Sequence, residues 1–349
     1  MQTEIIKVTE DSSVTELLAP AAEIIRQGGL VVFPTETVYG LGADATNPLA
    51  TAKIYEAKGR PSDNPLIIHV STPEEAEHYA FTNSLYYSLA EAFMPGPLTV
   101  ILKARESIPL TTRGGLDTVA VRCPESEIAR ELIRQAGVPI AAPSANLSGS
   151  PSPTNASHVI DDMMGRVDAI IDGGDSDFGL ESTIVKIDSE TTVTLLRPGK
   201  ITVEDISSIG VDVRLANAVT ESMKTDEIAL SPGMKYKHYA PSAPLFLVES
   251  TPEQYAEYIL ANSDSKNIAV ICYDDESDYL SDKIPFADFY MFGKRSDKMA
   301  QAHMLFKVLR DTDKKTYSKI YAPLPSKDGI GLALYNRMIR AAAHKIIRL

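Results

Sequence analysis

Basic and amide side chains gather in the segment KGRPSDNPLIIHV at residues 58–70. Lys58 and Arg60 form a K-x-R pair, and Asn64 and His69 follow it. Lysine supplies a point charge and arginine a planar fork of donors, a combination suited to phosphate oxygens. A solvated surface pair is the alternative, but two prolines constrain the loop and an apolar strand follows it. We therefore interpret the segment as part of a site for a phosphorylated ligand.

The loop APSANLSGSPSPT at residues 142–154 is rich in hydroxyl groups and small side chains, and it follows an expected strand. Such a loop can form a nest of hydrogen-bond donors around a phosphate. A flexible serine-rich loop is the alternative, which the prolines of the segment disfavour. The Walker A pattern is absent from the chain, so the loop is not an ordinary P-loop.

Other polar residues stand beside expected strands. PTETVYGLGADATN at 34–47 places the hydroxyl and carboxylate groups of Thr35, Glu36, Thr37 and Tyr39 just after a buried strand. Open α/β sheets bind ligands there, although an ordinary polar turn is an equal alternative. His69 interrupts an apolar strand, where a histidine is more often structural than catalytic, and we interpret it as a substrate contact. Ser182 and Arg197 lie at strand edges, and either signal alone is weak. No second histidine stands nearby at metal-ligand spacing, which disfavours a zinc site.

The elements that must position these residues alternate along the chain. Helices are expected at 14–28 and 48–57 and strands at 30–33 and 66–70. The alternation continues through segments at 73–93, 98–104, 118–122, 125–136, 139–144, 168–174, 182–187 and 193–199. This strand-rich α/β order predicts a mixed sheet with helices on its faces over roughly the first 205 residues.

A change of character divides the chain into two expected domains, at 1–206 and 244–349, joined by a linker at 207–243. The second domain is expected to contain strands at 245–248, 267–273 and 318–322, a strand or loop at 287–293, and helices at 252–261, 297–311 and 330–347. Its order predicts a small open α/β fold, Rossmann-like in layout but without the G-x-G-x-x-G fingerprint. A linker of about 25 residues can extend to roughly 80 Å, far enough to cross a domain face.

Composition and charge narrow the class of protein. A length of 349 residues makes two domains the default expectation. The formal net charge of -13 argues against a polyanion ligand, and basic motifs in an acidic body indicate a small anionic ligand. The sequence shows no apolar run long enough to span a membrane and no secretory signal. Two cysteines far apart fit a reducing cytosol, so we expect a cytoplasmic protein.

Six ordered motifs together resemble one family. They are the K-x-R at 58–60, the S-x-N at 144–146, PTETVYGLG at 34–42, MPGPLT at 94–99, VAVR at 119–122 and GLEST at 179–183. The chain resembles the threonylcarbamoyl-AMP synthase family, with a YrdC-type domain, in its long form with an added C-terminal domain. The resemblance implies a twisted mixed sheet with helices on its faces and a smaller Rossmann-like α/β domain.

The resemblance also implies a reaction. The family makes a carbamate from L-threonine and bicarbonate, adenylates it with ATP and releases pyrophosphate, which makes it a nucleotidyltransferase (L-threonylcarbamoyladenylate synthase). The product serves threonylcarbamoyladenosine formation next to the tRNA anticodon, so hand-over to a tRNA threonylcarbamoyl transferase machinery is expected. Mg²⁺ is expected to arrive with ATP rather than on protein side chains. Fixed Lys and Arg donors would stabilise charge on the phosphate, and a closing peptide would protect the labile carbamate.

Site residues follow from the resemblance position by position. ATP contacts are assigned to Lys58, Arg60, Asn64, Thr118, Ser144, Asn146, Ser152, Arg197 and Tyr236, with Lys58, Arg60, Ser144 and Asn146 as the catalytic set. L-Threonine contacts are assigned to Thr35, His69, Arg122, the backbone at Ala142 and Ser182, with Arg122 pairing the substrate carboxylate. The linker peptide around Tyr236 is the expected lid. No residue stands out as a general base.

Three competing interpretations remain. An RNA-binding protein is disfavoured by the net charge of -13 and by the lack of a basic stripe interleaved with aromatics. A carbamoyl-adenylate-forming domain of hydrogenase maturation proteins would carry zinc-binding cysteine pairs and an acylphosphatase-like region, and the sequence has neither. The C-terminal domain could be a regulatory module with its own ligand, but its sequence offers no recognisable site.

Overall fold

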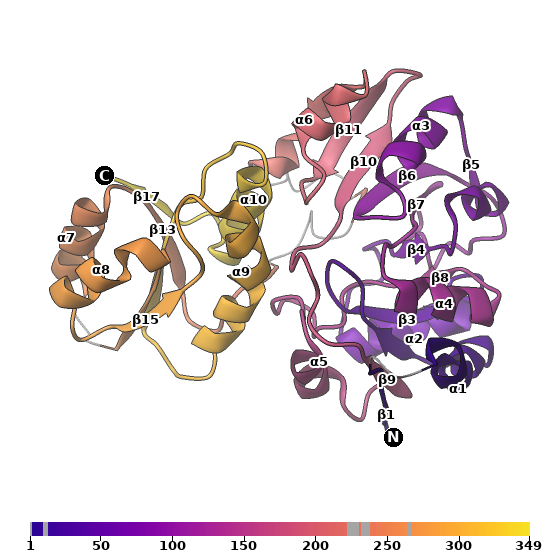
Figure 1. The fold of residues 1–349 in the computed structure, drawn as a ribbon, viewed down its shortest axis with the longest axis horizontal. Helices are drawn as coiled ribbons and strands as arrows, with labels where there is room; N and C mark the ends of the chain where they lie inside the picture. The colour runs from indigo at the N-terminus through magenta and orange to yellow at the C-terminus, as the bar shows by residue number, and fades with distance from the viewer. Residues whose placement is uncertain (1, 10–12, 222–229, 232–237, 264–266) are drawn as a thin grey trace. The chain divides into compact units, whose positions relative to one another are not determined.

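The computed structural model describes residues 2–9, 13–221, 230–231, 238–263 and 267–349 (Figure 1). The chain divides into two compact units, the first formed by residues 1–148 and 152–235 and the second by 149–151 and 236–349. The expected lid around Tyr236 and the two lysines that flank it lie outside the described residues.

One mixed sheet forms the framework of the first unit. Its strands run in the order β1-β9-β2-β3-β8-β4-β7-β6-β10-β11-β12, and β5 pairs with β6. The bounds are β1 (Glu4–Lys7), β2 (Val31–Phe33), β3 (Gly40–Asp44), β4 (Ile67–His69), β5 (Ala80–Phe81), β6 (Leu98–Ala104), β7 (Thr118–Arg122), β8 (Ile140–Ala141), β9 (Ala169–Asp172), β10 (Thr183–Ile187), β11 (Thr192–Arg197) and β12 (Asp212–Leu215). The sheet contains parallel pairs such as β4·β7 and antiparallel pairs such as β6·β7, which confirms the predicted mixed sheet.

Helices cover this sheet. The bounds are α1 (Val14–Arg26), α2 (Pro48–Lys58), α3 (Ser84–Phe93), α4 (Glu127–Ala136), α5 (Ala156–Met163) and α6 (Val203–Ser208), with short 3₁₀ segments η1 (Pro73–His78) and η2 (Asn217–Val219). Helices α1 and α4 lie side by side (Figure 1). Leu18 of α1 and Leu132 of α4 share a buried core with Val31 and Phe33 of β2. Burial of that apolar surface holds the strands whose ends carry the predicted site.

Helix α2 has clear start and stop signals, and it delivers a predicted site residue. The Asn47 side chain accepts hydrogen bonds from the backbone N–H groups of Leu49 and Ala50, and a proline occupies the first turn. Gly59 has φ 62°, the left-handed conformation that commonly ends a helix. Lys58 is therefore the last helical residue, and its side chain is buried.

The second unit contains a parallel sheet with strand order β15-β14-β16-β13-β17. The strands are β13 (Leu245–Glu249), β14 (Ile268–Cys272), β15 (Asp288–Met291), β16 (Lys319–Pro323) and β17 (Ile346–Arg348), and the helices are α7 (Pro252–Asn262), α8 (Ser277–Lys283), α9 (Lys298–Thr312) and α10 (Gly331–Ala341), with a 3₁₀ segment η3 (Asp274–Glu276). All its strand pairs are parallel, as the β-α-β order predicts. The fourth strand lies between the second and the first, which differs from the Rossmann order.

Two sequence-based expectations are wrong in detail. The final helix does not run from 330 to 347, because Ala343 and His344 have left-handed φ values of 48° and 60° that end it. Residues 346–348 instead pair with β13 as the strand β17. Part of the expected linker is also regular structure, since residues 212–215 form β12 and pair with β11.

Each unit contains one of the two cysteines. Cys123 and Cys272 are free and buried. Burial in apolar surroundings raises the pKa of each thiol to about 12.

Among the described helices, none combines the length and the apolar composition that a bilayer crossing would need.

Candidate functional site

The predicted site residues within the described part of the chain all belong to the first unit. They lie on or beside strands that are close neighbours in the sheet, in the order β2-β3-β8-β4-β7-β6-β10-β11. Three groups of contacts connect most of them. These groups centre on Lys58, on Arg122 and on Ser182.

The first group holds the ammonium of Lys58 against the loop at 142–154. Lys58 Nζ donates to the carbonyl oxygens of Ser144 at 2.6 Å and of Asn146 at 2.5 Å. The Ser144 hydroxyl donates to Asn146 Oδ1 at 2.5 Å. Lys58 is only 3% exposed, so its charge acts in surroundings of low dielectric. The structure thereby joins the K-x-R and S-x-N motifs, which are 86 residues apart, into one electropositive corner.

Arg60 lies in the loop after α2, where backbone oxygens orient its guanidinium. Arg60 Nη2 donates to the carbonyl oxygens of Asn64 at 3.3 Å and Pro65 at 3.1 Å. The Tyr55 hydroxyl also donates to the Asn64 carbonyl, at 3.3 Å. Burial raises the pKa of Tyr55 to about 12, against the opposing effect of the Arg60 charge, so this phenol stays a neutral donor. Asn64 Oδ1 is buried and has no partner among the described residues.

The second group centres on Arg122 at the end of β7. Arg122 Nη2 forms an ion pair with Glu36 Oε1 at 2.5 Å, with both side chains buried, and Nε donates to the Gly96 carbonyl at 3.3 Å. Thr35 precedes Glu36, and its hydroxyl donates to the Val38 carbonyl at 2.6 Å. The cation that was predicted to bind a substrate carboxylate is therefore bound to a protein carboxylate in this structure.

His69 is the register partner of Arg122 in the β4·β7 pair. Its Nδ1 lies 3.3 Å from the Ile140 carbonyl oxygen. Burial, aided by the Arg122 charge, lowers the pKa of His69 to about 3. The imidazole is therefore neutral at physiological pH, with Nδ1 as its donor nitrogen. It can offer a hydrogen bond but no charge.

The third group joins Ser182 and Arg197 at adjacent strands. Arg197 donates from Nε to the Ser182 carbonyl and from Nη2 to the Ser182 hydroxyl, both at 3.0 Å. The Ser182 hydroxyl also lies 2.8 Å from that of Thr99 on β6. One residue earlier, Glu181 accepts a hydrogen bond of 2.5 Å from Ser152. This bond ties the loop at 142–154 to the GLEST segment.

Two predicted site residues, Thr118 and Ala142, make no side-chain contact with the three groups among the described hydrogen bonds. Thr118 begins β7 and Arg122 ends it, so the strand separates the two side chains. Among the described residues, no hydrogen bond joins the Thr118 side chain to another predicted residue. The backbone N–H of Ala142 already donates to the Ile67 carbonyl at 2.9 Å, so this N–H is occupied in the structure.

Two acidic residues of the candidate site received no specific contact from the sequence, although Glu36 was named among the polar groups of its loop. Glu36 and Glu181 are 5% and 6% exposed and lie directly beside predicted ligand contacts. Both stand inside the PTETVYGLG and GLEST motifs, which was the available signal. Affinity for anions gives no reason to assign a substrate contact to either carboxylate.

A cavity of about 310 Å³ lies next to the second group. Thr35 and Glu36 line it, together with Glu125, Glu127, Asp175 and Asp177, so its wall is acidic. No group of three or more His, Cys, Asp or Glu side chains suited to a metal ion forms within the described residues.

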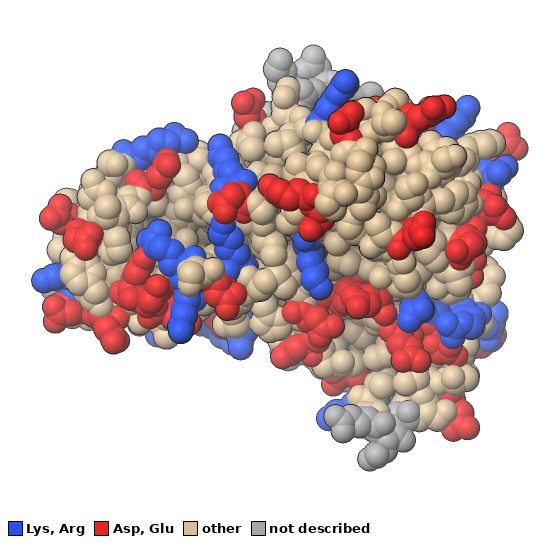
Figure 2. Space-filling model, turned by 45° about the horizontal axis from the view of Figure 1, so that its top comes forward, with Lys and Arg blue, Asp and Glu red and all other residues tan. Residues whose placement is uncertain are grey.

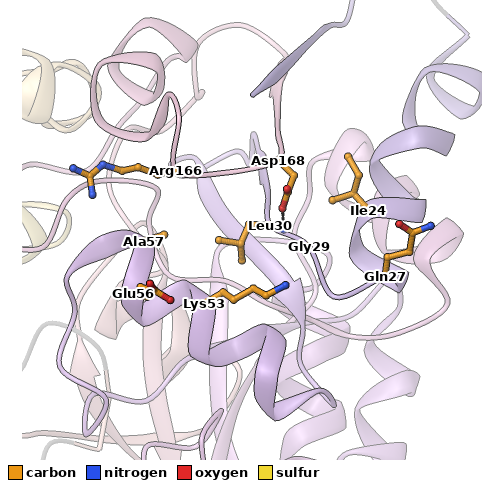
Figure 3. A pocket seen from close by; sticks show the side chains of 9 residues that line it. All are labelled: Ile24, Gln27, Gly29, Leu30, Lys53, Glu56, Ala57, Arg166 and Asp168. Atoms are coloured by element: carbon orange, nitrogen blue, oxygen red, sulfur yellow. Dashed lines mark hydrogen bonds between the residues drawn. The ribbon is translucent and has the colours of Figure 1, made fainter. Parts of the chain in front are cut away.

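A larger cavity of about 600 Å³ lies elsewhere in the first unit (Figure 3). Figure 3 shows Lys53 and Glu56 of α2 on one side, Arg166 and Asp168 on another, and Ile24 and Gln27 at the end of α1 on a third. None of the predicted site residues lines it. Its Lys53 ammonium already donates to the Gly28 carbonyl at 2.6 Å, and Asp168 accepts from the Leu30 N–H at 2.7 Å.

Fold and candidate site together define an α/β protein in which a mixed sheet carries a cluster of buried basic and polar side chains, followed along the chain by a parallel α/β domain. The Sua5_yciO_yrdC family, described as "Telomere recombination", matches residues 23–199. The family described as "Threonylcarbamoyl-AMP synthase, C-terminal domain" matches residues 201–343. The chain belongs to the threonylcarbamoyl-AMP synthase family, in its two-domain form.

Similar proteins span nearly the whole chain. A threonylcarbamoyl-AMP synthase of Pyrococcus abyssi is 43% identical over 94% of both chains. One of Bacillus subtilis is 40% identical over 98% of both. The solved structure of P. abyssi Sua5 complexed with L-threonine has a TM-score of 0.90 at 41% identity, and it covers 99% of this chain and 100% of that one. This agreement confirms the predicted fold class.

Proposed function

We propose that the chain is a nucleotidyltransferase that condenses L-threonine, bicarbonate and ATP into threonylcarbamoyl-AMP and releases pyrophosphate. The observation that carries the proposal is a pair of buried cations in the first unit, Lys58 at its electropositive corner and Arg122 at the end of β7. An adenylation needs both a phosphate site and a carboxylate site, and these two cations supply them.

The first and third groups bind ATP in this proposal. Lys58 and Arg60 face the phosphates, and Asn64, Thr118, Ser144, Asn146, Ser152, Arg197 and Tyr236 complete the nucleotide contacts. Charge builds up on phosphate oxygens when the carbamate carboxylate attacks the α-phosphate. Lys58 is fixed by backbone oxygens before ATP arrives, so little reorganisation is needed at the moment of reaction.

The second group binds L-threonine. Arg122 pairs with the substrate carboxylate, while Thr35, neutral His69, the Ala142 backbone and Ser182 supply hydrogen bonds. A neutral His69 leaves Arg122 as the single cation of the β4·β7 pair. The P. abyssi structure that this chain resembles is a complex with L-threonine, which supports a threonine site in this fold.

Magnesium, the lid and the destination of the product complete the proposal. Mg²⁺ would be carried by the ATP phosphates and would neutralise part of their charge. The peptide around Tyr236 would close over the labile carbamate. The product would pass to the tRNA threonylcarbamoyl transferase machinery in the cytoplasm.

The test is reconstitution with purified protein, ATP, Mg²⁺, bicarbonate and L-threonine. Pyrophosphate release and a threonylcarbamoyl-AMP peak in the mass spectrum should appear together. Omission of threonine or bicarbonate should abolish both signals. Intact ATP under complete conditions would contradict the proposal. A chain that leaves ATP intact but binds RNA tightly would support the RNA-binding interpretation.

A further inference from the structure

The Glu36 carboxylate is out of place in a site that binds anions. It lies against Arg122, the cation assigned to the substrate carboxylate, with 2.5 Å between Arg122 Nη2 and Glu36 Oε1. The two side chains are 4% and 5% exposed. A threonine carboxylate cannot take the same guanidinium edge while Glu36 occupies it. Substrate binding therefore requires Glu36 to shift or to share its partner.

We propose that Glu36 is a catalytic residue of the carbamate step: the threonine carboxylate displaces it from Arg122, and the displaced carboxylate accepts the proton that carbamate formation releases. The inference rests on the proposed function and deepens it. Glu36 would act twice, first as a stand-in for the substrate carboxylate and then as the general base.

Carbamate formation needs a proton acceptor. A threonine ammonium (R–NH₃⁺) and bicarbonate give the carbamate (R–NH–COO⁻), water and one proton. A new N–C bond forms, a C–O bond of bicarbonate breaks, and its oxygen leaves as water. The ammonium loses two protons, one to that water and one to a base. With Glu36 as the base, the products are the carbamate, water and a neutral carboxyl group.

Among the residues assigned to the substrates, the other groups are poor proton acceptors. Lys58 and Arg122 are cations, and neutral His69 resists protonation, because burial and the Arg122 charge lower its pKa to about 3. The hydroxyl of Thr35 is already a donor to the Val38 carbonyl. Glu36 lines the same cavity as Thr35, a proposed threonine contact.

The second carboxylate oxygen also indicates a donor-bearing ligand. Glu36 Oε2 is buried and has no hydrogen-bond partner among the described residues. A buried carboxylate oxygen without a donor is costly. The threonine ammonium carries N–H donors of the correct charge. The acidic wall of the neighbouring cavity, from Glu125, Glu127, Asp175 and Asp177, also favours a cationic group here.

Substitution of Glu36 separates this role from a structural one. In Glu36→Gln, we expect the affinity for L-threonine to stay within about tenfold of the wild type, because the loss of a competitor for Arg122 offsets the loss of a carboxylate partner for the ammonium. Turnover to threonylcarbamoyl-AMP should fall about 10²-fold or more, the usual contribution of a general base. Residual turnover should rise with pH, since solvent bases then accept the proton, while wild-type turnover stays flat over pH 7–9.

The pH profile must be interpreted with the neighbouring charges in mind. Two neighbouring groups come from the end of β7: Arg122, which pairs with Glu36, and Cys123, the next residue along the chain. His69 on the adjacent strand β4 is the third. The four acidic residues of the cavity wall share its other side. These groups are the same in the wild type and in every Glu36 variant. A difference between their profiles therefore reports on Glu36.

Controls distinguish a failed inference from a failed function. Glu91→Gln, an exposed glutamate on α3, should behave as the wild type. If the wild type and Glu91→Gln are both inactive, the proposed function is overturned, and this inference with it. If they are active and Glu36→Gln turns over at the wild-type rate, or loses threonine affinity and turnover in equal measure, only the inference is overturned. Glu36→Asp keeps a carboxylate and should retain at least tenfold more turnover than Glu36→Gln, with a flat pH profile. If Glu36→Gln does not fold, a pH-dependent Glu36→Asp variant overturns the inference and a flat profile supports it.

Discussion

At the scale of single residues, Lys58 shows how a site is prepared before its ligand arrives. Backbone carbonyl oxygens of Ser144 and Asn146 hold its ammonium at 2.6 and 2.5 Å. Those oxygens belong to the loop that is proposed to wrap the phosphates. The same charge therefore organises the loop and binds the nucleotide.

We predict that Lys58→Ala lowers threonylcarbamoyl-AMP formation by about 10²–10³-fold, the usual cost of removing one preorganised donor. Lys53→Ala is the matched control, because Lys53 lies on the same helix and is exposed. The measurement is the rate of pyrophosphate release at saturating substrates. A control that fell as far as Lys58→Ala would mean that damage to the helix, not the lost charge, lowers activity.

His69 gives a prediction for stability against pH. Its pKa is about 3 in the folded chain, below its ordinary value of about 6.5. The unfolded chain therefore binds the proton first as the pH falls. The stability that neutral His69 permits is complete above about pH 6.5 and is lost progressively towards pH 3, by at most about 1.4 kcal/mol per pH unit.

The check is denaturant unfolding of the wild type and of His69→Gln at pH 7.5, 6.5 and 5.5. We expect the wild type to lose free energy of unfolding relative to the variant as the pH falls. A difference that stays constant across this range would contradict a neutral, buried His69.

The residues themselves were predictable to different degrees. Lys58, Arg60 and Arg122 could be selected because their charge suits an anionic substrate. Glu36 could be named as a polar group at the end of a strand, but its role could not be predicted, since its contact with Arg122 is visible only in the structure. That contact joins residues 86 positions apart, and sequence spacing carries no information about it.

At the scale of elements, close backbone packing holds the site segments in place. Gly199 follows β11 and lies against the start of β10. A Cβ at this position would lie 2.5 Å from the Thr183 nitrogen and 2.8 Å from the Glu181 carbonyl oxygen. Ser182 lies between those two residues. Any side chain at 199 must therefore displace the segment that carries Ser182.

We predict that Gly199→Ala costs about 1–3 kcal/mol of stability and lowers activity at least about tenfold, because small displacements of site groups are costly. Gly137→Ala is the control, since Gly137 ends α4 at φ 68° with open space around its Cβ position. It should cost about 1–2 kcal/mol through backbone strain but keep full activity. Chemical denaturation and pyrophosphate release measure the two effects.

Elements were predictable where local signals agree. Asn47 and Gly59 mark the two ends of α2, and the structure places the helix at 48–58. The C-terminal end of the last helix was predicted wrongly, because the helical periodicity of the sequence continues past residues 343 and 344, which have left-handed φ values. Strand β12 was missed for another reason. It is a short edge strand whose pairing with β11 is a tertiary contact that no local pattern reports.

At the scale of the whole molecule, charge bears on the RNA-binding alternative. The net charge is -13, and Figure 2 shows acidic and basic side chains interspersed on the face drawn. We predict that tRNA binds more weakly than about 10 µM at 150 mM salt, within the range of non-specific association. Fluorescence anisotropy with labelled tRNA is the measurement. Submicromolar binding that weakens steeply with salt would contradict this prediction.

The two buried cysteines can be used to measure how each unit of the chain unfolds. Alkylating reagents attack the thiolate, and burial both shields Cys123 and Cys272 and raises the pKa of each to about 12. Each thiol therefore reacts only after the unit around it unfolds locally or globally. One cysteine belongs to each unit, so pulsed alkylation followed by peptide mass analysis would time the opening of the two units separately, without any added label. The natural sequence thus allows the order in which the two units unfold to be determined.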